Sequence, residues 1–136
     1  MAVTRTRASL AIQHDALAAH HVTDVLGIAP TESFEVGDTY ARDMLTRDHS
    51  HWSLESPAPD DAPLEQQLRA LLDVVAPSRA GLAMLAREDY RLTWTCFVEE
   101  DHGDGAVSLS SGLLAELGSL PVDLWFDSYA DSEQPA

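Results

Sequence analysis

Two histidines, His49 and His51, are the first candidates for chemistry in this sequence. They lie in a segment that alternates polar and apolar residues, which predicts a β-strand with both imidazoles on one face. Histidines at this spacing can bind a divalent metal, and Asp43, Asp48 or Glu55 would complete the ligand set. The alternative is a solvated strand face beside a turn, because a metal site also needs donors that converge from elsewhere in the chain.

The single cysteine, Cys96, is a second candidate, and it excludes an intrachain disulfide. It falls on the apolar side of a strongly alternating segment, where a cysteine packs as a small hydrophobic residue. A nucleophile would need partial exposure and a base, and no motif places a histidine beside it. The loop Asp101–Gly105 resembles a calcium loop, but its spacing favours a hairpin connection. Glycine-rich phosphate motifs are absent, so we predict no catalytic residue and no cofactor, and lean against an enzyme.

Trp125 is a candidate for protein binding, because tryptophan is enriched at interface hot spots. In the alternating segment near the end of the chain it shares one side with Asp123 and Asp127. A half-covered edge residue is the alternative interpretation. The predicted partner-binding set consists of these three residues and a second acidic cluster: Glu99, Glu100 and Asp101.

Charge is the strongest feature of the composition. The chain has 136 residues, with 23 acidic residues against 8 basic ones and a net charge of −15. Such a field repels phosphate backbones and anionic lipids, so we expect neither nucleic acid nor membrane as a partner. No apolar run approaches the roughly 20 residues of a membrane helix, and no secretory signal is recognisable. We therefore expect a cytoplasmic protein, and the absence of lysine and asparagine indicates a GC-rich bacterial genome.

Hydrophobic periodicity predicts the elements that position these residues. Strands are expected at 4–12, 33–36, 49–56, 89–100, 107–109 and 121–129, with 39–48 either strand or loop. Helices are expected at 15–26, with Gly27 as the stop signal, and at 62–75, 78–87 and from Ser110 or Ser111 to Gly118. Together they predict an α+β domain over residues 1–129, with an antiparallel or mixed sheet of about five strands and helices packed on one face. Residues 130–136 are expected to form a flexible acidic tail.

Several short motifs are similar to those of a known family. They are Leu26-Gly27-Ile28-Ala29-Pro30-Thr31, Val36-Gly37-Asp38, Trp52-Ser53-Leu54-Glu55-Ser56, the helix Leu64–Leu72, and the segment Leu109–Gly118 before a strand rich in aspartate. Over about residues 7–129 the chain resembles the DUF4279 family of small, mostly bacterial domains of uncharacterised function. The resemblance implies a standalone α+β domain and assigns no catalytic residue.

Three functions remain open from the sequence. The leading hypothesis is a non-catalytic module that binds a basic protein, as an immunity or antitoxin-like protein would. The second is an enzyme or regulator that binds a metal or small ligand through His49 and His51. The third is a homo-oligomeric accessory, such as a homodimer, with an edge strand or the Trp125 surface as its contact.

Overall fold

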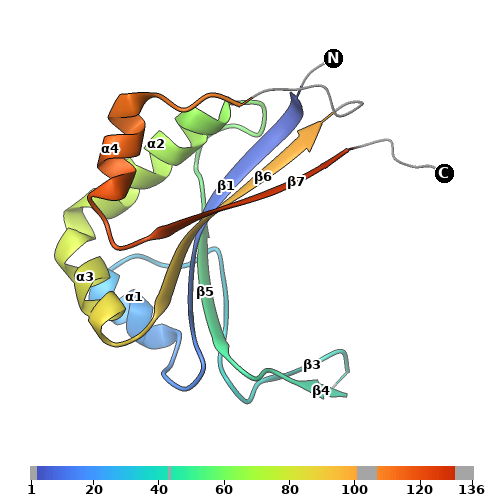
Figure 1. Ribbon diagram of the computed structural model, residues 1–136. Helices are drawn as coiled ribbons and strands as arrows, with labels where there is room; N and C mark the ends of the chain where they lie inside the picture. Colours follow the sequence, from blue (N-terminus) through green and yellow to red (C-terminus); the bar gives the residue numbers. More distant parts are fainter. Residues whose placement is uncertain (1–2, 43, 101–106, 131–136) are drawn as a thin grey trace.

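A five-stranded mixed sheet with helices on one face forms the body of the protein (Figure 1). The computed structural model describes residues 3–42, 44–100 and 107–130. The strands of the main sheet are β1 (Val3–His14), β2 (Glu32–Phe34), β5 (Ser50–Glu55), β6 (Arg91–Glu100) and β7 (Asp123–Ala130). The helices are α1 (His20–Leu26), α2 (Leu64–Val75), α3 (Arg79–Arg87) and α4 (Ser111–Gly118), with a 3-10 turn, η1 (Ala76–Ser78), between α2 and α3. The predicted α+β architecture is confirmed.

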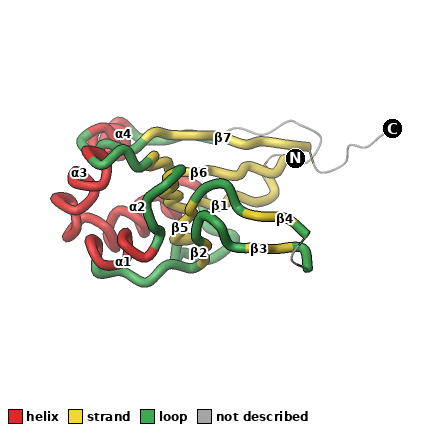
Figure 2. Tube along the Cα trace, turned by 90° about the horizontal axis from the view of Figure 1, so that it is seen from below, coloured by secondary structure: helices red, strands yellow, loops and turns green. Residues whose placement is uncertain are grey.

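The order of the sheet is β2-β5-β1-β6-β7. All neighbouring strands are antiparallel except β6 and β7, which run parallel. A parallel neighbour requires the chain to cross back along the sheet, and α4 lies in that connection. Figure 2 shows the result from below, with β7 at one edge of the main sheet.

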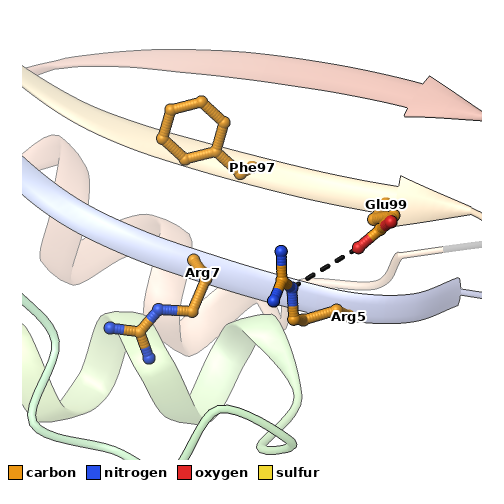
Figure 3. Close-up of a pocket in the computed structure, with 4 residues that line it drawn as sticks. All are labelled: Arg5, Arg7, Phe97 and Glu99. Atoms are coloured by element: carbon orange, nitrogen blue, oxygen red, sulfur yellow. Dashed lines mark ion pairs between the residues drawn. The ribbon is translucent and has the colours of Figure 1, made fainter. Parts of the chain in front are cut away.

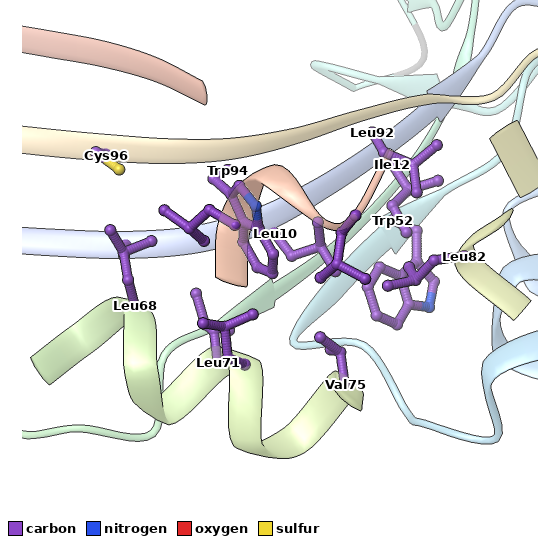
Figure 4. Close-up of a cluster of buried hydrophobic side chains, with 14 of the residues drawn as sticks. Leu10, Ile12, Trp52, Leu68, Leu71, Val75, Leu82, Leu92, Trp94 and Cys96 are labelled. Carbon is purple, nitrogen blue, oxygen red and sulfur yellow. The ribbon is translucent and has the colours of Figure 1, made fainter. Parts of the chain in front are cut away.

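Burial on the helix-covered side, here called the inner face, follows the alternation expected from the sequence (Figure 4). Every second residue of β1 and β6 is buried there: Thr6, Ala8, Leu10 and Ile12, and Leu92, Trp94, Cys96 and Val98. Helix α2 covers them with a stripe of buried leucines and a valine: Leu64, Leu68, Leu71, Leu72 and Val75. Alternate residues of a strand point to opposite faces, so the other side of the sheet carries the polar residues.

The first helix begins at His20, not near Asp15 as the periodicity predicts. The Nδ1 atom of His14 accepts two backbone N–H groups of the following turn, at 2.9 Å each. The Glu35 carboxylate accepts the N–H groups of Ala19 and His20 at 2.7 and 2.9 Å. These bonds satisfy backbone donors outside a helix and cap the start of α1 from a distant segment.

Other boundaries also differ from the expectation. Residues 107–109 form no strand and lead directly into α4, whose first turn is capped by the Ser110 hydroxyl as predicted. The ambiguous segment 39–48 contains a separate hairpin of β3 (Thr39–Tyr40) and β4 (Leu45–Thr46). The short strand near residue 33 ends at Phe34, and the predicted strand at 49–56 begins at Ser50. Ala130 is the last residue of β7, and the predicted tail from 131 on lies outside the described residues.

Candidate functional site

The face of the sheet opposite the helices, here called the open face, carries the candidate site. Residues paired across neighbouring strands share a face, so the register of β1, β6 and β7 identifies its members. They are Arg5, Arg7, Ser9, Ala11 and Gln13 on β1, Arg91, Thr93, Thr95, Phe97 and Glu99 on β6, and Asp123, Trp125 and Asp127 on β7. The described helices all pack on the inner face, so side chains of the open face reach the surface.

Among the described side chains of this face, Trp125 is the most exposed aromatic one, with 61% of its surface accessible. It lies beside Thr95, and the next residue pair on the same face is Phe97 and Asp127. Phe97 is itself 38% exposed, so two exposed aromatic groups lie near each other on the open face. Exposed aromatic groups of this kind mark binding surfaces more often than isolated surface leucines do.

Two carboxylates flank Trp125 along β7. Asp123 and Asp127 occupy the same face two residues to either side, as the alternation predicts. Within the described part of the chain, neither carboxylate forms an ion pair or a hydrogen bond. Both carboxylates are therefore accessible to an external cation, next to the negative face of an indole ring.

The arginines of the open face are held by carboxylates of the chain itself. Arg7 donates to Glu55 at 3.0 Å and to Asp60 at 2.9 Å, which joins β1 to β5 and to the loop before α2. Arg5 lies 3.4 Å from a carboxylate oxygen of Glu99. The positive charge at this end of the sheet is compensated, whereas the carboxylates beside Trp125 are not.

A shallow hollow of about 220 Å³ lies between these arginines and Phe97, with Glu99 at its rim (Figure 3). A second hollow of about 150 Å³ shares Arg7 and Phe97 and extends toward Ser9. The aliphatic and aromatic walls of these hollows can receive a side chain of a partner. Their cations are already paired, which disfavours capture of a free anion.

Gln67 fixes the strand that carries the hollow. Its side chain is completely buried, and its amide donates to the carbonyl oxygens of Thr6 at 3.2 Å and Pro59 at 2.8 Å. Its carbonyl oxygen accepts a long bond of 3.5 Å from Arg7. A buried amide with its donors and acceptor satisfied locks β1, α2 and the intervening loop into one arrangement.

His49 and His51 both lie against the Phe34 ring, His49 edge-on and His51 stacked. Their ring centroids are 5.3 and 5.1 Å from that of Phe34. His51 contacts Gln13 through Nδ1 at 2.9 Å, and burial lowers the pKa of His51 below its ordinary value. His49 contacts Asp48 at 2.7 Å, and this hydrogen bond lowers the pKa of that carboxyl.

The predicted third ligands do not converge on this pair among the residues that the structure describes. Glu55 is engaged with Arg7, Asp48 contacts His49 alone, and Asp43 lies outside the described residues. No group of three or more potential ligands in ranges 3–42, 44–100 and 107–130 is placed to hold a metal ion. The metal hypothesis therefore gains no ligand set from this part of the chain.

Cys96 lies in the core, fully buried between β6 and the helices. Burial raises the pKa of its thiol to about 12, so the reactive thiolate is not formed at neutral pH. The interpretation of Cys96 as a packing residue agrees with this position.

Of the predicted partner-binding residues, the structure brings Trp125, Asp123, Asp127 and Glu99 onto the open face. The side chain of Glu100 and all of Asp101 lie outside the described residues. Phe97 was not among the predicted set. The signal for it was present, because an aromatic residue on the polar side of an alternating strand is a candidate surface contact.

These features define a class of protein: an α+β domain with a helical layer on one side of its sheet and an acidic, aromatic patch on the other. The chain matches the family model of DUF4279, a domain of unknown function, over residues 4–131, and it belongs to that family. No curated protein and no solved structure matches it. Within ranges 3–42, 44–100 and 107–130, no helix has both the length and the apolar character needed to cross a membrane.

Proposed function

We propose that this chain is a non-catalytic protein-binding module whose open face, centred on Trp125, binds a basic segment of another protein. The observation that carries the proposal is the exposed indole of Trp125 between the carboxylates of Asp123 and Asp127, neither of which has a partner among the described residues. An arginine or lysine side chain can lie over the ring while its charged group reaches either carboxylate.

The whole-chain charge supports the same kind of partner. A net charge of −15 accelerates the approach of a cationic protein and disfavours acidic competitors. The hollows beside Phe97 provide apolar surface next to the charged contacts. One form of this function is an immunity or antitoxin-like protein that masks a cationic toxin.

The test uses the full chain as bait in a lysate of its host. We expect a basic partner to be captured at about 0.1 M salt and released at about 1 M, where the Debye length falls from about 10 to about 3 Å. Trp125→Ala should abolish capture, and Asp123→Asn with Asp127→Asn should weaken it.

Matched controls separate the surface from general effects. Leu114→Ala removes an apolar group of similar exposure on α4, away from the open face. Asp24→Asn with Asp73→Asn removes the same charge from exposed positions on α1 and α2. Both controls should capture the partner as the unchanged chain does. Absence of any partner at low salt, or full capture by Trp125→Ala, would contradict the proposal.

A further inference from the structure

We infer that the basic segment binds as an added β-strand along the free edge of β7, with cationic and apolar side chains in alternation. The inference rests on the proposed function and specifies how that surface is used. In the sheet order β7 is terminal and pairs with β6 alone among the described strands. An edge strand presents a row of N–H and C=O groups that an extended segment can satisfy.

The length of this edge distinguishes it from the opposite one. Strand β7 contains eight residues, whereas β2, at the other end of the sheet, contains three. Native proteins commonly protect a long apolar edge, because it otherwise recruits other chains. The described part of this chain places no strand or helix against the outer side of β7.

Strand β7 carries exposed apolar or aromatic side chains on both of its faces. Leu124 and Phe126 pair with Trp94 and Cys96 and therefore point to the inner face, yet they are 39% and 47% exposed. Trp125, between them, points to the open face. The edge therefore carries apolar surface on its inner face and an acidic, aromatic surface on its open face.

These two surfaces determine the side-chain pattern of the added strand. Successive side chains of a strand point to opposite faces of the sheet. Every second residue of the bound segment would meet Asp123, Trp125 and Asp127, which favours arginine or lysine. The residues between them would meet Leu124 and Phe126, which favours β-branched or other apolar side chains.

Charge selects this partner over a second copy of the same chain. Two copies paired through β7 would bring both pairs of uncompensated carboxylates, Asp123 and Asp127, onto one shared open face. Like charges across neighbouring strands are destabilising, and each copy also carries a net charge of −15. A cationic segment has the complementary charge.

The experiment compares three synthetic octapeptides, which match the eight residues of β7. The first alternates arginine and valine, and the second has four arginines followed by four valines. The third is the alternating peptide with an N-methyl group on every backbone amide. Binding to the full chain is measured by calorimetry. We expect the block peptide to bind about tenfold more weakly than the alternating one, a difference of about 1.4 kcal/mol. The reason is that half of its arginines would meet Leu124 and Phe126 instead of the carboxylates. The N-methylated peptide, which has no backbone N–H group to donate to β7, should lose at least as much.

Two protein variants locate the bound strand. Leu124→Thr with Phe126→Thr keeps β-forming residues but removes the apolar surface of the inner face. This variant should lower the affinity for the alternating peptide to that of the block peptide while leaving the block peptide unchanged. Trp125→Ala should weaken both peptides. Because the peptide comparison uses the unchanged chain, it does not depend on the folding of any variant.

The outcomes separate the inference from the proposed function. Equal binding of all three peptides to the unchanged chain, with all three weakened by Trp125→Ala, overturns strand addition and leaves the basic-segment site intact. Absence of binding by every peptide, or full binding of both unmethylated peptides to Trp125→Ala, overturns both proposals. A dimer of the free chain that Leu124→Thr with Phe126→Thr converts to monomer assigns the edge to a second copy and overturns the inference.

Discussion

The two buried tryptophans, Trp52 and Trp94, provide a sensitive test of the structure, because replacement of each by phenylalanine should have very different costs. Both side chains are completely buried in the same core. The Nε1–H of Trp52 donates to the Thr23 hydroxyl at 3.0 Å. The Nε1–H of Trp94 has no partner among the described residues.

The apolar loss in Trp→Phe is nearly the same at the two positions, so the N–H groups determine the difference. Trp52→Phe removes a hydrogen bond worth about 1 kcal/mol. Trp94→Phe removes an unsatisfied buried donor, whose burial costs about 1–3 kcal/mol. We therefore expect Trp52→Phe to lower the free energy of unfolding by about 2–4 kcal/mol more than Trp94→Phe does.

Urea unfolding followed by far-ultraviolet circular dichroism measures both losses, provided that the m-values of the variants agree. Thr23→Val is the matched control, because it removes the acceptor and leaves the shape of the side chain. A double-mutant cycle between Trp52→Phe and Thr23→Val should give a coupling of about 1 kcal/mol. Equal losses for the two tryptophan variants, or a greater loss for Trp94→Phe, would refute the reasoning.

Three further predictions concern single side chains. Burial lowers the pKa of His51 below 6.5, so as the pH decreases the unfolded chain binds a proton before the folded chain does, and the free energy of unfolding decreases below about pH 6.5. In urea melts, His51→Gln should therefore gain stability relative to the unchanged chain as the pH is lowered from about 7.5 to about 5.5. A constant difference between the two proteins would contradict this. Ser110→Ala removes the hydroxyl that accepts a hydrogen bond from the N–H of Leu113 at 3.2 Å. In the same urea melts it should lower the free energy of unfolding by about 1 kcal/mol, and a change near zero would show that the cap contributes nothing. Cys96, fully buried with its pKa raised to about 12, should resist iodoacetamide in buffer and react in urea, as mass spectrometry can follow; rapid labelling of the native chain would place it at the surface.

The candidate site could be predicted in part. The alternation of the last strand places Trp125 on one side with Asp123 and Asp127, because side-chain direction in a strand depends on sequence parity alone. The neighbourhood of Phe97 could not be predicted, since it requires β7 to lie parallel to β6 in one register. The hollow at Arg7 likewise depends on partners more than forty residues away, such as Glu55 and Asp60.

What the sequence determined by itself is which residues enter the core. Buried residues alternate from Thr6 to Ile12 and from Leu92 to Val98, as the geometry of a strand requires, and they form a helical stripe in Leu64–Val75. The buried residues can therefore be predicted from these periods alone.

Only the tertiary structure decided the order of the described strands, with β7 at one edge, and the start of α1 at His20. The strand order is fixed by packing and loop closure among distant segments, which leave no periodic pattern. The start of α1 is fixed by the Glu35 carboxylate, which accepts its first N–H groups from fifteen residues away in the chain. Hydrophobic periodicity records only which face of an element is buried, and it carries no information about the neighbour that buries it.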